Sequence, residues 1–104
     1  MFSFIETKLF TRLVGTYLSD EEYQKLQSHL IQNPEAGKIV PGSGGVRKLR
    51  WRAAGRGKRG GYRVIYFTQV EQGVIWMVTL YPKNVRDTIA AHVLRQIRNE
   101  VEDG

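Results

Sequence analysis

The chain lacks cysteine altogether and has only two histidines among its 104 residues. Without cysteine it cannot form disulfides, thiolate zinc sites, iron–sulfur clusters or a cysteine nucleophile, and such a composition suits a reducing cytoplasm. The two histidines, His29 and His92, are far apart in segments with a helical pattern, which disfavours metal-dependent hydrolysis and histidine-based triads. We therefore expect a cytoplasmic protein that uses neither a metal nor another cofactor.

Long apolar runs are also missing. No stretch approaches the roughly 18 consecutive apolar residues of a membrane-spanning helix. Glu6 and Lys8 interrupt the N-terminal segment where a signal peptide needs an unbroken apolar core. Hydrophobic residues make up 41% of the chain and charged residues 25%, a balance typical of a folded protein. The length is that of one ordinary domain, so we expect a single domain over residues 1–104 and no membrane partner.

The hydrophobic periodicity of the first half predicts a short strand followed by two amphipathic helices. The strand is expected at residues 2–5 and the first helix at about 7–18. Ser19 and Glu22 have the spacing of a capping box, which predicts the start of the second helix. Asn33 precedes a proline and ends that helix, because proline removes a hydrogen-bond donor and disfavours helix for the residue before it.

A glycine-rich loop is expected over residues 35–46, and beyond it the apolar residues alternate with period two. This alternation predicts three strands in an antiparallel meander, at residues 47–53, 62–69 and 74–81. A long glycine-rich hairpin connects the first two strands. The first of these strands has an apolar face made of Leu49, Trp51 and Ala53. Its other face is cationic and is made of Lys48, Arg50 and Arg52.

A final helix completes the predicted fold. Asn84 is a favourable N-cap residue and Asp87 follows three residues later. The apolar stripe of this helix is made of Ile89, Val93, Leu94, Ile97 and Val101. The resulting order β-α-α-β-β-β-α predicts an α+β domain of two layers, with helices packed on a largely antiparallel sheet.

Positive charge is concentrated in one segment. The chain has a net charge of +6, and eight of its sixteen cationic residues lie between Arg47 and Arg63, where there is no acidic residue. Like charges on neighbouring pleats of a strand repel one another, so this concentration indicates an anionic partner such as nucleic acid. The alternative is a solvated edge strand whose charges only prevent aggregation.

RNA suits this segment better than the major groove of DNA. No helix-turn-helix or zinc-finger pattern is visible, and the charges lie on a strand and a loop rather than on a helix. Aromatic side chains of the later strands could stack on unpaired bases, although most of them are expected in the core. Tyr62 and Tyr81 are the candidates for exposure, because a tyrosine hydroxyl needs a polar outlet. The candidate RNA-binding residues are Arg47, Arg52, Arg56, Lys58, Arg59 and Tyr62.

Three stretches of the sequence resemble the HigB branch of the RelE/ParE toxin superfamily. They run from Val46 to Arg50, from Gly57 to Phe67 with the sequence GKRGGYRVIYF, and from Leu80 to Asn84. The resemblance covers nearly the whole chain and implies a RelE-like fold. It further implies a bacterial type II toxin that cuts mRNA in the A site of the 70S ribosome. Such a toxin is neutralised by a cognate antitoxin, in this branch usually a small helix-turn-helix protein.

The resemblance also implies the chemistry. In RelE-like members the ribose 2′-hydroxyl attacks the adjacent phosphate and the 5′-oxygen leaves. The catalytic cations of the family match Lys48, Arg50 and Arg63, and Lys83 offers a further cation after the last strand. Fixed cations stabilise the charge that develops on the phosphate, and the two arginines suit its oxygens because guanidinium binds them in a bidentate way. Lys48 is the candidate general base, because cationic neighbours favour a neutral amine, and a simple phosphate anchor is its alternative role.

The chain departs from its relatives at two positions. RelE-type enzymes often carry a tyrosine on the C-terminal helix and an arginine just before it, and the matching positions here hold Ala90 and Asn84. Tyr81 is then the candidate acid for the leaving group. Two other functions stay open on the sequence alone: a gyrase poison of the ParE type, and an RNA- or ribosome-binding protein without catalytic activity.

Overall fold

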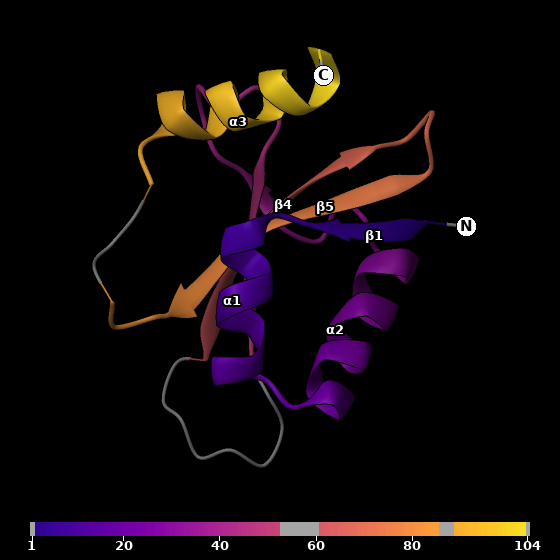
Figure 1. Cartoon of the computed structure of the whole chain (residues 1–104), viewed down its shortest axis with the longest axis vertical. Helices are drawn as coiled ribbons and strands as arrows, with labels where there is room; N and C mark the ends of the chain where they lie inside the picture. Colours follow the sequence, from indigo (N-terminus) through magenta and orange to yellow (C-terminus); the bar gives the residue numbers. More distant parts are fainter. Residues whose placement is uncertain (1, 53–60, 86–88, 104) are drawn as a thin grey trace.

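The computed structural model describes residues 2–52, 61–85 and 89–103 of the chain. Figure 1 shows a sheet in the middle of the molecule with helices packed against it. The α+β class is confirmed, and so is the predicted order of elements apart from one added short strand. In chain order the elements are β1 (Ser3–Glu6), α1 (Lys8–Tyr17), α2 (Asp20–Gln32), β2 (Lys38–Ile39), β3 (Arg47–Trp51), β4 (Tyr62–Gln69), β5 (Val74–Pro82) and α3 (Ala91–Asp103).

The strands form one mixed sheet with the order β1-β5-β4-β3-β2. Strands β3, β4 and β5 make the antiparallel meander that the period-two alternation predicts. Strand β1 pairs with β5 in parallel, and β2 pairs antiparallel with the outer edge of β3. The sheet is therefore largely antiparallel, and the basic strand β3 lies near one of its edges.

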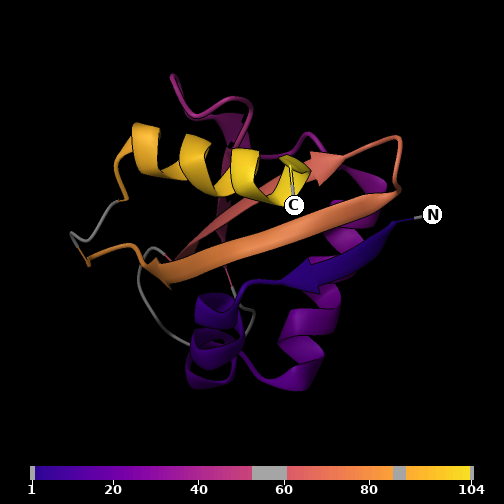
Figure 2. The ribbon, with the colours of Figure 1, turned by 45° about the horizontal axis from the view of Figure 1, so that its top comes forward.

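Each face of the sheet carries its own apolar cluster. One cluster joins the sheet to α1 and α2 through buried side chains such as Phe10, Leu26 and Tyr66. The other joins the opposite face to α3 through Phe67 and Leu94. Figure 2 shows α3 on one side of the sheet and the α1–α2 pair on the other. We call these the α3 face and the α1–α2 face. The molecule thus has three layers where the sequence predicts two.

Helices α1 and α2 both begin directly after an N-cap residue, and the cap of α2 is the predicted one. The Thr7 hydroxyl oxygen accepts a hydrogen bond from the Phe10 N–H at 3.1 Å. The Ser19 hydroxyl accepts from the Glu22 N–H at 3.2 Å, while the Glu22 carboxylate accepts from the Ser19 N–H at 2.8 Å. These reciprocal bonds confirm the capping box and satisfy two amide donors that a helix end would otherwise leave unpaired.

The structure corrects two expectations about the elements. Helix α3 begins at Ala91, where the Ala90 carbonyl accepts the first helical hydrogen bonds, and Asn84 is therefore not its N-cap. Asn84 instead lies in a turn directly after β5, because the chain must first leave the sheet before it can begin a helix. The second correction is β2, which forms inside the predicted loop at residues 35–46 because Lys38 and Ile39 pair with β3.

Candidate nucleic-acid interface

A row of three predicted catalytic residues crosses the meander. Arg50 of β3 is opposite Arg63 of β4, and Arg63 is opposite Tyr81 of β5. Residues directly opposite one another on neighbouring strands point to the same face of a sheet. Tyr81 packs against the apolar cluster under α3, so the whole row lies on the α3 face. The structure thus brings together three side chains that are far apart in the sequence.

A second row lies beside the first. Lys48 is opposite Lys38 on one side and opposite the buried Ile65 on the other, so both lysines share the α3 face with Arg50 and Arg63. Lys48 precedes Arg50 by two residues, which corresponds to about 7 Å along a strand. The two rows therefore place cations at two neighbouring positions on one surface.

These cations line a groove of about 620 Å³ on the α3 face. One wall is formed by residues 36 and 38–41, which precede β3 in the chain. The sheet contributes Lys48, Arg50 and Arg63. No aspartate or glutamate is among the described residues that line this groove. Its electrostatic character is therefore positive, and an anion bound in it would meet several donors at once.

Arg63 and Tyr81 are the least solvated members of the row. The Nη1 atom of Arg63 is buried and has no hydrogen-bond partner within the described ranges of the chain. A buried guanidinium nitrogen without an acceptor is costly unless a ligand supplies one. Burial raises the pKa of the Tyr81 phenol above its ordinary value of 10, an effect that the nearby positive charge of Arg63 opposes. Tyr81 therefore keeps its proton at neutral pH and can act as a hydrogen-bond donor.

Lys83 lies at the same end of the sheet as Arg63. Its side chain is exposed, and its backbone N–H donates to the Gly61 carbonyl at 3.1 Å, directly before β4 begins. This bond ties the segment after β5 to the start of β4. Lys83 therefore lies exposed near the end of the row that contains Arg63 and Tyr81, and its catalytic role stays a prediction.

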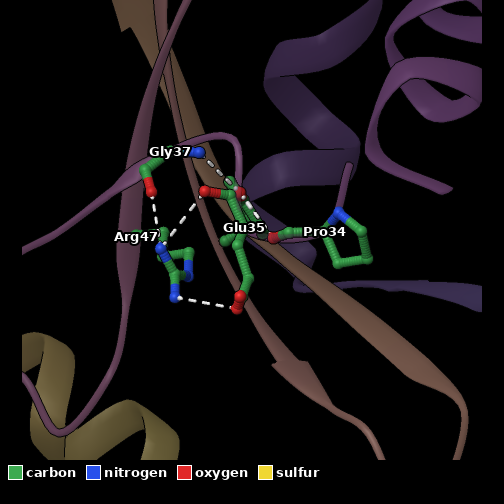
Figure 3. A network of polar contacts seen from close by, with 5 residues as sticks. Pro34, Glu35, Gly37 and Arg47 are labelled. Carbon is green, nitrogen blue, oxygen red and sulfur yellow. Dashed lines mark hydrogen bonds and ion pairs between the residues drawn. The ribbon is translucent and has the colours of Figure 1, made fainter. Parts of the chain in front are cut away.

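Arg47 is used differently from the prediction. It is opposite Tyr66, which belongs to the apolar cluster on the α1–α2 face, so its side chain points away from the groove. Its Nη1 donates to the carbonyls of Gly37 at 2.7 Å and Glu35 at 3.3 Å, and its Nη2 is 4.0 Å from the Glu35 carboxylate. Figure 3 shows the guanidinium among these acceptors. Arg47 therefore holds the chain before β2 in place and is not an RNA-binding residue of the groove.

Tyr66 completes this anchor. Its hydroxyl accepts from the Gly37 N–H at 2.9 Å and donates to the Pro34 carbonyl at 2.8 Å. Residues 34–37 are thus fixed from the α1–α2 face by one buried phenol and one guanidinium, as the dashed lines in Figure 3 indicate. Because β2 follows directly, this anchor also positions the wall of the groove.

The other predicted RNA-binding residues have different outcomes. Tyr62 is only 2% exposed, and its ring packs on Tyr17 at a centroid distance of 5.4 Å on the α1–α2 face. It cannot stack on a base, because the pleat turns it into the core. Arg52 is exposed directly after the last residue of β3, and its role in RNA binding stays a prediction. Three further candidates lie outside the described residues: Arg56, Lys58 and Arg59.

Sequence reasoning missed Lys38 as a member of the site. A single lysine in a glycine-rich stretch carries no periodic signal, and a strand of two residues is too short to show alternation. Its place depends on the pairing of β2 with β3, which puts Lys38 opposite Lys48. The sequence offered only a weak signal for a strand here, a lysine followed by the β-branched Ile39 within the predicted loop.

Two general features of the described residues bear on the remaining expectations. No helix among them is long and apolar enough to cross a membrane. Within the same part of the chain, no three histidine, aspartate or glutamate side chains gather in a way that could hold a metal ion. The side chains of the two rows on the α3 face are those of lysine, arginine and tyrosine.

Comparison with known proteins gives a consistent result. Residues 4–102 match the family model described as the RelE toxin of the RelE/RelB toxin–antitoxin system. The fold is similar to the toxin in the intact E. coli RelBE toxin–antitoxin complex, with a TM-score of 0.60, 18% identity, and coverage of 82% of this chain and 100% of that one. It is also similar to the isolated E. coli RelE toxin, with a TM-score of 0.58 and 18% identity over 93% of this chain and 99% of that one. The archaeal RelE–RelB complex from Pyrococcus horikoshii gives a TM-score of 0.52 and 22% identity, covering 83% of this chain and 98% of that one.

Proposed function

The chain belongs to the RelE toxin family of RelE/RelB toxin–antitoxin systems, and on this premise we propose that it is a ribosome-dependent endoribonuclease that cuts mRNA in the ribosomal A site. The observation that carries the proposal is the row of Arg50, Arg63 and Tyr81 on the α3 face. The adjacent groove, whose described lining residues include no carboxylate, supports it further. Such a surface fits the phosphate of a single RNA strand and not a neutral or cationic substrate.

The proposed reaction is an internal transesterification. The ribose 2′-oxygen forms a bond to the adjacent phosphorus, and the bond from phosphorus to the 5′-oxygen of the next nucleotide breaks. The products are a 2′,3′-cyclic phosphate and a free 5′-hydroxyl. Lys48 would take the 2′-hydroxyl proton, and the Tyr81 phenol would give its proton to the leaving 5′-oxygen. No water, metal or redox partner is consumed in this step.

The two arginines would stabilise the transition state. The pentacovalent phosphate carries more negative charge than the substrate, and donors fixed beside it bind that charge without having to reorganise. The buried Nη1 of Arg63 has no acceptor in the described structure, so a phosphate oxygen would satisfy it. Arg50 is exposed opposite it and can bind the same phosphate from the solvent side. Lys83 would contribute a further cation at the end of β5.

The proposed partners follow from the family. The E. coli relative occurs in a complex of toxin and antitoxin, and we extend a cognate antitoxin to this chain by that likeness. An antitoxin that covers the groove should present acidic side chains to it, since charge complementarity speeds and orients association. That this antitoxin is of the helix-turn-helix type, and that the target is the ribosome with its mRNA, stay predictions.

Variants of the row test the proposed function. Arg63→Ala should slow cleavage of mRNA on programmed ribosomes by about 10²- to 10³-fold, as the loss of one transition-state donor does elsewhere. Arg63→Lys should keep the charge but lose the bidentate geometry, so its cleavage rate should lie between those of the wild type and Arg63→Ala. Arg12→Ala changes an exposed arginine on α1 and should cleave at the wild-type rate. Primer extension maps the new 5′ ends, and circular dichroism shows whether each variant is folded.

Three outcomes would contradict the proposal. If Lys48→Ala, Arg50→Ala and Arg63→Ala all remain as toxic as the wild type, the assignment of the catalytic site is wrong. DNA damage without new mRNA ends would indicate a gyrase poison instead. Binding of ribosomes without any cleavage product would indicate a protein that blocks translation by occupancy alone.

A further inference from the structure

The position of Lys38 points to a function beyond the reacting row. Lys38 is exposed and directly opposite the half-buried Lys48 across the β2–β3 pair, and both line the groove. Like charges directly opposite one another destabilise a sheet. No described acidic side chain lines the groove to offset them. An anion held between the two lysines would remove this repulsion.

Lys38 is also held in a fixed place. The residue before it, Gly37, is hydrogen-bonded on both sides, by the Tyr66 hydroxyl to its N–H and by Arg47 to its carbonyl. Two residues after it, the Val40 N–H donates to the Val46 carbonyl at 2.8 Å. The backbone that carries Lys38 is therefore anchored on both sides, so binding of a ligand does not have to order this segment of the chain.

The two rows of cations have the spacing of successive nucleotides. The Lys38–Lys48 row and the Arg50–Arg63 row are two residues apart on β3, about 7 Å for an extended strand. A single-stranded RNA presents one phosphate per nucleotide at a comparable separation. If one phosphate lies at the Arg50–Arg63 row, the neighbouring phosphate of the same strand falls beside Lys38.

We infer that Lys38 binds the phosphate adjacent to the scissile one, so that the groove holds two successive phosphates of a single RNA strand. This inference rests on the proposed function and adds a substrate-binding residue to it. Lys38 does not touch the reacting phosphate. It selects an RNA that continues past the cleavage site, and it sets the register of that strand across the row of Arg50, Arg63 and Tyr81.

The first test measures binding without cleavage. The probe is a fluorescent, fully 2′-O-methylated hexanucleotide, which cannot react because its 2′-oxygens are blocked. Lys38→Ala should weaken binding about threefold to tenfold and lower the slope of log K against log salt by about 0.7, the value for one lost contact to a single strand. Lys38→Arg should restore the slope. Lys25→Ala, an exposed lysine on α2, should keep the wild-type slope. A purely structural role for Lys38 would not change the number of ions released.

The second test identifies the phosphate. Programmed ribosomes carry an mRNA with one neutral methylphosphonate, placed either 5′ or 3′ of the scissile phosphate. On one of these two messages the KM of wild type and of Lys38→Ala should become equal, because the charge that Lys38 binds has been removed, while kcat stays unchanged. If the two proteins still differ on both messages, the inference is overturned.

The outcomes separate this inference from the function on which it rests. If Lys48→Ala and Arg50→Ala lower the salt slope and Lys38→Ala does not, the Lys38 contact is wrong and the endonuclease proposal stands. If none of the three substitutions lowers the slope and none of them slows cleavage on programmed ribosomes, the groove is not an RNA site and both proposals are wrong.

Discussion

Tyr66→Phe is the substitution whose energetic cost can be worked most directly from the structure. The ring is fully buried in the core and would be kept by phenylalanine. Only the hydroxyl is lost, and it makes two hydrogen bonds, one from the Gly37 N–H at 2.9 Å and one to the Pro34 carbonyl at 2.8 Å. The substitution therefore separates the anchor of residues 34–37 from the packing of the sheet.

The two orphaned backbone groups differ in exposure. The bond at the Gly37 N–H is buried, so this donor would lose its partner without access to water, at a cost of about 2 kcal/mol. The bond at the Pro34 carbonyl is only partly buried, and water can replace part of it, which leaves about 1 kcal/mol. Together they predict a loss of about 3 kcal/mol, a large share of the roughly 5–15 kcal/mol that stabilises an ordinary domain.

Urea and thermal denaturation measure this loss. A loss of 3 kcal/mol corresponds to a fall in Tm of about 12–24 °C for a domain of this size. The matched control is Tyr17→Phe, because the described residues offer no hydrogen-bond partner to the hydroxyl of Tyr17 and its ring contact with Tyr62 is kept. Its expected effect is within about 0.5 kcal/mol. Hydrogen exchange adds a local readout, since the Gly37 amide should lose protection in Tyr66→Phe. Equal stability of the two variants would refute the anchor.

Two further predictions concern a partly buried tyrosine and a pair of glycines. Burial, and then the hydrogen bond to Glu6 at 2.7 Å, raise the pKa of Tyr23 above its ordinary value of 10, so this contribution to stability is complete below pH 10 and is lost as the pH rises above it. Tyr23→Phe should lower the free energy of unfolding by about 1–2 kcal/mol at pH 7. Above pH 10, urea denaturation should show that the free energy of unfolding falls less steeply with pH in the variant, by about 1 kcal/mol or less per pH unit. An unchanged dependence on pH would contradict this role of Tyr23. Gly61→Ala should lower stability by at least about 2 kcal/mol, because φ is +64° and a Cβ would overlap the Trp51 carbonyl oxygen. Gly15→Ala on α1, where a Cβ meets nothing within 4 Å, should instead raise the Tm, and the opposite ranking of these two variants would disprove the steric account.

Much of the fold follows from local patterns in the sequence. The capping box at Ser19 and the period-two alternation of the second half predict α2 and the meander, because each signal repeats or is reciprocal over several residues. The start of α3 was misplaced because Asn84 and Asp87 have the residue types of a helix start, whereas the helix begins only at Ala91. The parallel pairing of β1 with β5 and the position of α3 on its own face depend on contacts far apart in sequence, which no local pattern encodes.

The site was predictable to the extent that alternation could be applied to it. Lys48 and Arg50 share a face as predicted. The same alternation puts Arg47 with Leu49 on the other face, and a count of the charges in the segment does not show this difference. Tyr62 was misassigned for a similar reason: it is adjacent to Arg63 and so points the other way. The place of Lys38 could not be predicted, because it results from a pairing of two residues that only the folded chain defines.

Alternation also explains how an uncompensated cationic groove can exist on a domain of this size. Along β3 and β4, residues that are neighbours in sequence serve opposite faces, as Arg47 and Lys48 do, or Tyr62 and Arg63. The apolar clusters on both faces and the anchor on the α1–α2 face stabilise the domain, so the repulsion between cations in the groove does not have to be offset by contacts within the groove. Substitutions of adjacent residues should therefore act on different properties. We expect a change at Arg47 to alter stability through residues 35–37, and a change at Lys48 to alter the proposed binding and cleavage of RNA. A correlation of the two effects would mean that the two faces are coupled through the strand itself.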